Sequence, residues 1–122
     1  MNNPVTWFEI GCVDLERAKS FYAEVFEASF EYVPMPDAPM YMFAGSPESI
    51  GAMGALVKSE NNSPSADGTI VYFGSEDVAV EAGRVDAAGG KLLFPKTSIG
   101  EFGFIAQFMD TEGNRIGLHS NQ

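Results

Sequence analysis

The chain of 122 residues and 13.1 kDa has the size of one compact domain, which buries roughly two-thirds of the unfolded chain's surface. Seven Lys and Arg against seventeen Asp and Glu give a net charge of −10, and the basic residues are scattered from Arg17 to Arg115. We therefore expect no nucleic-acid partner and no anionic membrane surface as partner. No apolar run approaches the roughly 20 residues that a membrane-spanning helix requires.

The cysteine content and the N-terminus indicate the cellular compartment. Cys12 is the only cysteine, so it cannot form a disulfide within the chain. The opening residues Met-Asn-Asn-Pro lack the basic and apolar regions of a signal peptide. We therefore expect a reduced, cytoplasmic protein.

The first half of the chain has the pattern of a strand, a helix and three further strands. Residues 5–11 are rich in aromatic and β-branched side chains, which is typical of a strand. Asp14 can cap a helix, and the apolar residues after it recur at helical spacing as far as Phe26. Three more strands are predicted at residues 30–33, 40–44 and 52–58.

The second half repeats this order after a polar connector. Residues 60–68 contain nothing suited to a core and are predicted to be a solvated linker. A strand at 69–74 and a helix that begins at Asp77 and ends at Gly89 and Gly90 follow. Further strands are predicted at 91–94, 102–109 and 115–120.

A shift of 63 residues relates the two halves. It aligns four residue pairs, namely Thr6 with Thr69, Gly11 with Gly74, Asp14 with Asp77, and Gly54 with Gly117. Two similar units without common descent would give the same architecture. The expected fold class is α+β, with two βαβββ modules forming a barrel-like or cradle-like cavity: module one at about 5–58, a linker at 60–68 and module two at about 69–120, together one domain spanning 1–122.

Motifs near both ends of the chain resemble those of the vicinal oxygen chelate superfamily, the glyoxalase, bleomycin-resistance and dioxygenase group. They are Val13-Asp14-Leu15-Glu16-Arg17-Ala18-Lys19-Ser20-Phe21-Tyr22, Ala88-Gly89-Gly90, Pro95-Lys96-Thr97 and Asp110-Thr111-Glu112-Gly113-Asn114-Arg115-Ile116. In appearance the chain is similar to small bacterial proteins related to lactoylglutathione lyase. The resemblance implies paired βαβββ modules and commonly a homodimer.

Catalytic members of this family hold a divalent metal with His, Glu or Gln from four strand positions. Carried over by spacing from the capping aspartates and the glycines, these positions fall on Trp7, Gly54, Ile70 and Gly117. None of these side chains can donate an electron pair to a metal ion. We therefore predict no metal site and no cofactor. A divalent metal is not excluded: Glu9 and His119 lie two positions along on the faces of Trp7 and Gly117, although two ligands alone do not make a site.

Strand alternation predicts which side chains face the cavity. Trp7, Glu9, Tyr72 and His119 are the expected ligand-binding residues, because the apolar residues between them are needed under the helices. Trp7 could stack on a flat ligand or fill the core. Glu9 is the one candidate catalytic residue, as a general base, and is equally a solvated carboxylate. For His119 and Tyr72, a structural hydrogen bond is the more conservative interpretation.

Three hypotheses for function follow. The leading one is a small-molecule-binding protein of this family that works without the family's metal. The second is a lyase or isomerase in which Glu9 transfers a proton, with His119 or Tyr72 polarising the substrate. The third is an assembly module whose cavity is filled by its own side chains. The residues leave open whether the protein is an enzyme, and whether modules pair within one chain or between two.

Overall fold

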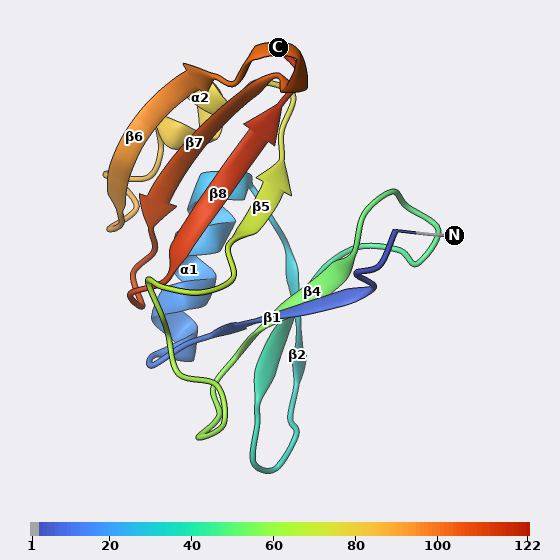
Figure 1. Ribbon diagram of the computed structural model, residues 1–122. Helices are drawn as coiled ribbons and strands as arrows, with labels where there is room; N and C mark the ends of the chain where they lie inside the picture. Colours follow the sequence, from blue (N-terminus) through green and yellow to red (C-terminus); the bar gives the residue numbers. More distant parts are fainter. Residues whose placement is uncertain (1–2) are drawn as a thin grey trace.

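The computed structural model describes residues 3–122 and contains two four-stranded sheets and two α-helices (Figure 1). The expected order of elements is found, in an α+β arrangement of two βαβββ modules. Module one contains β1 (Trp7–Gly11), α1 (Leu15–Phe26), β2 (Phe30–Val33), β3 (Met40–Phe43) and β4 (Met53–Val57). Module two contains β5 (Val71–Gly74), α2 (Val78–Ala82), β6 (Lys91–Ser98), β7 (Phe104–Met109) and β8 (Arg115–Ser120), with a 3-10 turn at Gly100–Phe102.

Both sheets have the same topology. The strand orders are β1-β4-β3-β2 and β5-β8-β7-β6, so the first strand of each module pairs with the last. The β1–β4 and β5–β8 pairs are parallel, and the remaining pairs are antiparallel. Within one chain the two sheets do not close into a barrel, so the cradle-like form of the prediction holds and the closed form does not.

The first helix is formed as the sequence predicts. The side chain of Asp14 accepts a hydrogen bond from the backbone amide of Arg17, which satisfies a free donor of the first turn. The apolar stripe of α1 is fully buried at Ala18, Phe21, Tyr22 and Val25. The helix thus covers its sheet with the face that the 3.6-residue period defines.

The second helix is shorter than predicted. It is capped by Asp77 as expected, but α2 ends at Ala82, with Gly83 at the C-terminal cap. From there to Gly90 the chain continues as turns held largely by i to i−3 hydrogen bonds, because glycine weakens the helical path. Gly89, at φ 103°, reverses the chain as predicted, and the amide of Gly90 donates to the carbonyl of Val85.

The predicted strand at 91–94 extends to Ser98. The pairing of β6 with β7 shifts register between Leu92 and Phe94 and again between Phe94 and Thr97. Pro95 lies within the second of these shifts and cannot donate to the ladder, so the strand passes it through an irregularity. This is tolerated because β6 is the edge strand of its sheet.

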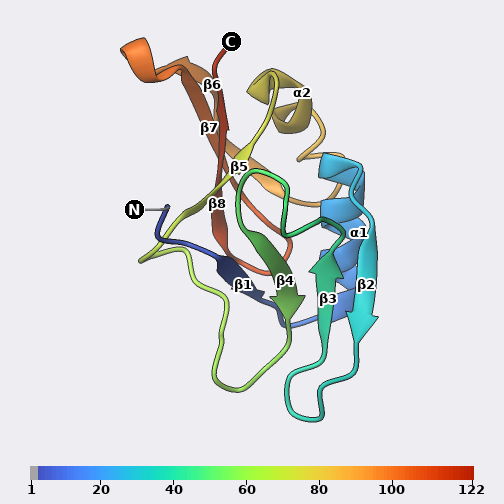
Figure 2. The ribbon, with the colours of Figure 1, turned by 90° about the vertical axis from the view of Figure 1, so that its right-hand side faces the viewer.

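One apolar core joins the two modules. Phe8 on β1 lies 5.7 Å from Phe73 on β5, measured between ring centroids, and Phe26 of α1 stacks on Phe73 at 4.5 Å. Phe21 of α1 also packs on Phe108 of β7. The two helices therefore lie on one side of the molecule, as Figure 2 shows, and the opposite face of each sheet is turned outward.

A buried polar turn ties module two to the start of α1. The carboxylate of Glu112, whose side chain is fully buried, accepts hydrogen bonds from the amides of Val13 and Asp14 at 2.8 and 2.7 Å. Arg17 donates to the same carboxylate at 2.8 Å. Beside it, Asp110 accepts a hydrogen bond of 2.6 Å from the hydroxyl of Tyr22.

The charge state of Glu112 is set by this turn. Burial by itself would raise the pKa of the carboxyl, but the hydrogen bonds from Arg17, Asp14, Thr111 and Val13 hold the pKa below its usual value. The carboxylate thus contributes stability that is complete above the pKa of an unfolded glutamate. The contribution is lost as pH falls through the lower pKa of the folded protein.

We expect Glu112→Gln to lower the free energy of unfolding by about 1.5–3 kcal/mol at pH 7, because charge-assisted hydrogen bonds are lost. Urea unfolding at several pH values measures this. The difference in free energy of unfolding between wild type and Glu112→Gln should become smaller below about pH 4, because the wild-type carboxylate is then protonated and uncharged. Glu24→Gln, on an exposed position of α1, is the matched control and should change little. An equal difference in free energy of unfolding at pH 7 and pH 3 would show that the charged carboxylate of Glu112 is not the stabilising group.

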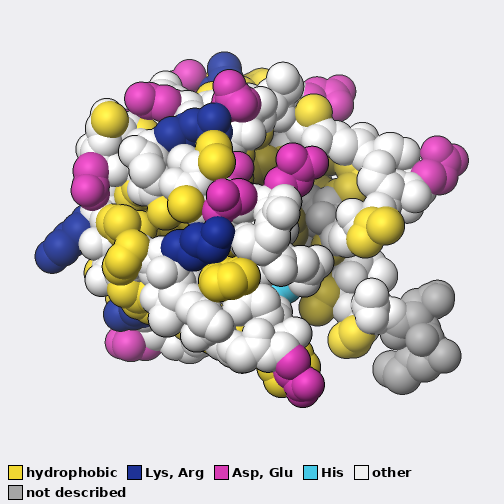
Figure 3. Space-filling model, turned by 90° about the horizontal axis from the view of Figure 1, so that it is seen from above, with side chains coloured by type: hydrophobic (Ala, Val, Ile, Leu, Met, Phe, Trp, Pro, Cys, Tyr) yellow, Lys and Arg dark blue, Asp and Glu magenta, His cyan; other side chains and the backbone are white. Residues whose placement is uncertain are grey.

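Among residues 3–122, no helix is both long and apolar enough to cross a bilayer. Met1 and Asn2, part of the segment expected to lack signal-peptide features, lie outside the described residues. Acidic and basic side chains are interspersed over the face drawn in Figure 3, where the basic ones form no single patch.

Candidate functional site

The outward faces of the two sheets carry the four predicted ligand-binding residues. In module one, Trp7 pairs with Met53 and Glu9 with Ala55, so these four side chains share the face opposite to the helices. In module two, Tyr72 pairs with Gly117, and β8 continues to His119 on the same face. The expected orientation of these side chains agrees with the observed strand register.

Trp7 and Glu9 form a pair on β1. The indole Nε1 donates a hydrogen bond of 3.1 Å to Oε2 of Glu9. Both side chains are exposed, with 40% of Trp7 accessible. Trp7 therefore does not fill the core of this chain, and its ring is free to meet a flat molecule laid on the sheet.

Tyr72 belongs to a row of hydrogen-bonded side chains on the other sheet. Its hydroxyl accepts a hydrogen bond of 2.7 Å from Nε2 of Gln107 on β7. Oε1 of Gln107 in turn accepts one of 3.0 Å from Nη1 of Arg115 on β8. Gln107 is almost fully buried, whereas 43% of Tyr72 is accessible. Sequence reasoning missed Gln107 and Arg115, because only the cross-strand register brings them beside Tyr72.

His119 is held by the turn between β6 and β7. Its Nε2 lies 2.6 Å from the carbonyl oxygen of Phe102, which can only accept, so this nitrogen carries the hydrogen. Phe102 itself is 69% exposed at the tip of the hairpin. Residues 100–102 form a 3-10 turn, and β7 begins at Phe104.

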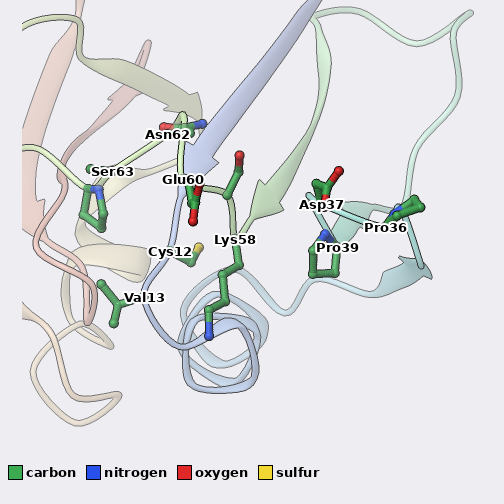
Figure 4. Close-up of a pocket in the computed structure, with 11 residues that line it drawn as sticks. Cys12, Val13, Pro36, Asp37, Pro39, Lys58, Glu60, Asn62 and Ser63 are labelled. Carbon is green, nitrogen blue, oxygen red and sulfur yellow. The ribbon is translucent and has the colours of Figure 1, made fainter.

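Trp7 and Glu9 lie on the first sheet, whereas Tyr72 and His119 lie on the second. Within the described part of the chain, no hydrogen bond links Trp7 or Glu9 to Tyr72 or His119. A hollow of about 200 Å³ lies at the seam between the modules, where Glu9 and Arg115 are among the lining residues. A second, more open hollow lies between the loops at 34–39 and 58–64 and contains none of the four (Figure 4). Neither hollow is lined by all four groups.

The strand register corrects one expected metal position. Gly54 pairs with Phe8, and a Cβ at Gly54 would overlap the Phe8 ring, so Gly54 faces the helices. The residue of β4 that corresponds to Gly117 is Ala55, because Glu9 pairs with Ala55 as Tyr72 pairs with Gly117. The alignment of Gly54 with Gly117 was therefore wrong by one residue. The shift of 63 fails here because it takes no account of the pairing.

The residues present do not fit a divalent metal at the position expected from the resemblance. Trp7, Ala55, Ile70 and Gly117 offer no side-chain lone pair suited to a metal ion. A Cβ at Gly117 would overlap the ring of Tyr72, which therefore occupies the space that a longer side chain at 117 would need. Over residues 3–122, no group of three or more His, Cys, Asp and Glu side chains is arranged to hold a metal.

Cys12 contributes to packing in the core. It is buried, and its thiol donates to the carbonyl of Ile10 at 3.4 Å. Burial, reinforced by Glu112 and Asp110, raises the pKa of the thiol to about 12. A thiol with this pKa holds its proton at neutral pH and is a poor nucleophile.

The sequence matches the Glyoxalase/Bleomycin resistance protein/Dioxygenase superfamily over residues 5–118. The chain belongs to this superfamily. Among curated proteins, none matches the sequence.

Several solved structures have the same fold. Glyoxalase I from Zea mays, as its V278E mutant, is 23% identical with a TM-score of 0.74; the match covers 97% of this chain but 46% of the maize chain. The chain thus spans about half the length of that enzyme. A glyoxalase-related enzyme from Fulvimarina pelagi is 22% identical with a TM-score of 0.73, covering 98% of this chain and 89% of the other. TnmS3, an antibiotic-binding protein from Streptomyces sp. CB03234, is 25% identical with a TM-score of 0.70, covering 99% and 98%.

We expect Gly117→Ala to lower the free energy of unfolding by about 1–3 kcal/mol, because the added methyl group displaces the Tyr72 ring. In the background of Tyr72→Ala the same change should cost much less, so chemical denaturation of the double-mutant cycle measures the contact. Gly74→Ala is the control, because a Cβ at that position meets no atom. Additive effects of the two substitutions would show that the ring does not lie over Gly117.

Proposed function

We propose that this protein binds a small molecule on the outward sheet faces without a metal at the family's site. The observation that carries the proposal is the ring of Tyr72 over Gly117, together with the absence of donor side chains at Trp7, Ala55 and Ile70. An aromatic ring offers a surface for stacking and apolar contact in the space where relatives place a metal ligand. We further propose that the protein is located in the cytoplasm. Its single cysteine, Cys12, is buried and unpaired, as is usual where thiols are kept reduced.

The side chains on the outward sheet faces suggest which class of ligand binds there. The outward face of module one carries three half-buried methionines, Met40, Met42 and Met53, beside Trp7. Methionine adapts its shape to irregular apolar partners, and tryptophan offers a flat contact. Polar groups are few and lie at fixed places, as is usual for sites that bind small organic molecules. A planar, largely apolar compound fits this surface best.

A second copy of the chain is the proposed cover of the site. The sheets of one chain open outward, so a ligand lying on either would remain half in water. A twofold axis can place module one of each protomer against module two of its partner, which forms two equal cavities. Each cavity would combine the Trp7–Glu9 pair of one protomer with Tyr72 and His119 of its partner. Trp7 on one face and Tyr72 on the other are exposed, and the three methionines beside Trp7 are only half-buried, which supports this arrangement.

Proton transfer by Glu9 is the second candidate function, as in a lyase or isomerase related to lactoylglutathione lyase. The hydrogen bond from Trp7 supports it, because this bond fixes the carboxylate through one oxygen and leaves the other free for a substrate. The single chain leaves Glu9 exposed, so this chemistry also needs the covering protomer. Glu9→Gln keeps the shape and removes the base. Unchanged turnover of a discovered substrate in this variant would exclude the mechanism.

The metal-free proposal predicts the composition of the purified protein. Elemental analysis of protein prepared without chelator should find far less than one nickel, zinc or iron per chain. EDTA should leave the melting temperature unchanged, because no bound ion stabilises the folded state. A thermal-shift screen of planar organic compounds should give ligands that raise the melting temperature. Stoichiometric metal that supports a reaction, or the lack of any ligand, would contradict the proposal.

The dimer predicts a separate result. Met42→Glu puts a charge in the middle of the outward face of module one, so sedimentation velocity should show a shift from dimer to monomer. The monomer should keep its fold, since this face lies toward solvent in the single chain. Ile50→Glu adds the same charge at a fully exposed loop position and should leave the dimer intact. Equal effects of both substitutions would exclude the proposed interface.

A further inference from the structure

The row Tyr72, Gln107 and Arg115 has a fixed direction of hydrogen bonding. Arginine can only donate, so the atom of Gln107 next to Nη1 of Arg115 must be the amide oxygen. The amide nitrogen then faces Tyr72 and must donate to the phenol oxygen, at 2.7 Å. The hydroxyl of Tyr72 therefore acts as acceptor toward the protein and keeps its own hydrogen available for another partner.

The start of this row is fixed by the linker between the modules. Nε of Arg115 donates to the carbonyl oxygen of Ala66 at 3.3 Å, and its backbone amide donates to that of Ser65 at 3.2 Å. Gln107 is almost fully buried in the sheet and has little freedom to turn its amide group. The direction of the row is thus set by groups outside the expected binding site.

Tyr72, the last residue of the row, is partly exposed to solvent. The ring of Tyr72 rests on the backbone of Gly117, which allows this close approach because it has no side chain. Within residues 3–122, the phenol oxygen has no hydrogen-bonded partner besides Gln107. A donor held in this way on an exposed sheet face suits an incoming acceptor.

We propose that Tyr72 is the specificity-determining hydrogen-bond donor of the binding site and selects ligands with a carbonyl oxygen, such as planar aromatic ketones. Gln107 and Arg115 are positioning residues that turn the phenolic hydrogen toward the ligand. A neutral carbonyl suits the site better than a carboxylate, because the chain has a net charge of −10 and the cavity includes Glu9. This inference rests on the proposed function, since it names the ligand class of the same site.

The test uses two probes of nearly the same shape, 9-fluorenone, which has a carbonyl oxygen, and fluorene, which lacks it. Quenching of Trp7, the only tryptophan, or calorimetry measures binding to the chain of 122 residues. Wild type should bind fluorenone about three- to tenfold more tightly than fluorene, the effect of one hydrogen bond. Tyr72→Phe should abolish this preference, because fluorenone then has no donor for its carbonyl oxygen.

Gln107→Glu tests the direction itself. A glutamate at 107 accepts from Arg115 and also from the phenol, so it turns the hydrogen of Tyr72 away from the ligand. The preference for fluorenone should be lost although Tyr72 is still present. Tyr32→Phe removes a hydroxyl from an exposed tyrosine on β2 and should keep the preference.

The outcomes separate this inference from the proposed function. If both probes bind wild type equally, or if Gln107→Glu keeps the preference, the inference is overturned and small-molecule binding stands. If neither probe binds wild type, both the proposed function for planar aromatic ligands and the inference are overturned. A preference lost in Tyr72→Phe and Gln107→Glu, and kept in Tyr32→Phe, supports the inference.

Discussion

The arrangement of the two modules depends on the buried carboxylates of the turn after β7. Glu112 and Asp110 are taken out of water, which would be costly without partners, and each receives hydrogen bonds from the other module or its own turn. Among residues 3–122, no buried side-chain nitrogen or oxygen lacks a partner. Module two can satisfy this turn only when it lies beside the start of α1. That contact keeps both helices on one side and turns both sheet faces outward.

The outward faces in turn define the chemistry available to this member of the superfamily. Gly117 lets the Tyr72 ring lie directly on β8, and the position that corresponds to it in module one is Ala55. Small residues at both places leave room for aromatic and apolar contacts but provide no metal ligands. The hydrogen-bonding groups of this face are therefore neighbouring side chains such as Gln107, whose amide orientation is fixed by Arg115. The faces are suited to recognition by shape and by a few directed polar contacts.

Local patterns predicted the elements that depend on local physics. The cap at Asp14, the apolar stripe of α1 and the strand Phe30–Val33 were found as predicted, since capping and periodicity act over a few residues. The second helix was predicted too long, because Gly83 ends the helical hydrogen bonding before the apolar pattern ends. The match of Gly54 to Gly117 was wrong because identity of residue type does not fix strand pairing.

Sequence patterns alone predicted the two βαβββ modules, the side of β1, β5 and β8 that faces the helices, and the lack of metal ligands at Trp7, Ile70 and Gly117. These properties follow from the alternation of side chains along a strand and from the chemistry of single side chains, both of which are local. The folded chain was needed to show that the sheets stay open, that the Tyr72 ring lies over Gly117, and that Gln107 and Arg115 lie beside it. These contacts join residues far apart in the chain, and the register between strands, rather than any local pattern, brings them together.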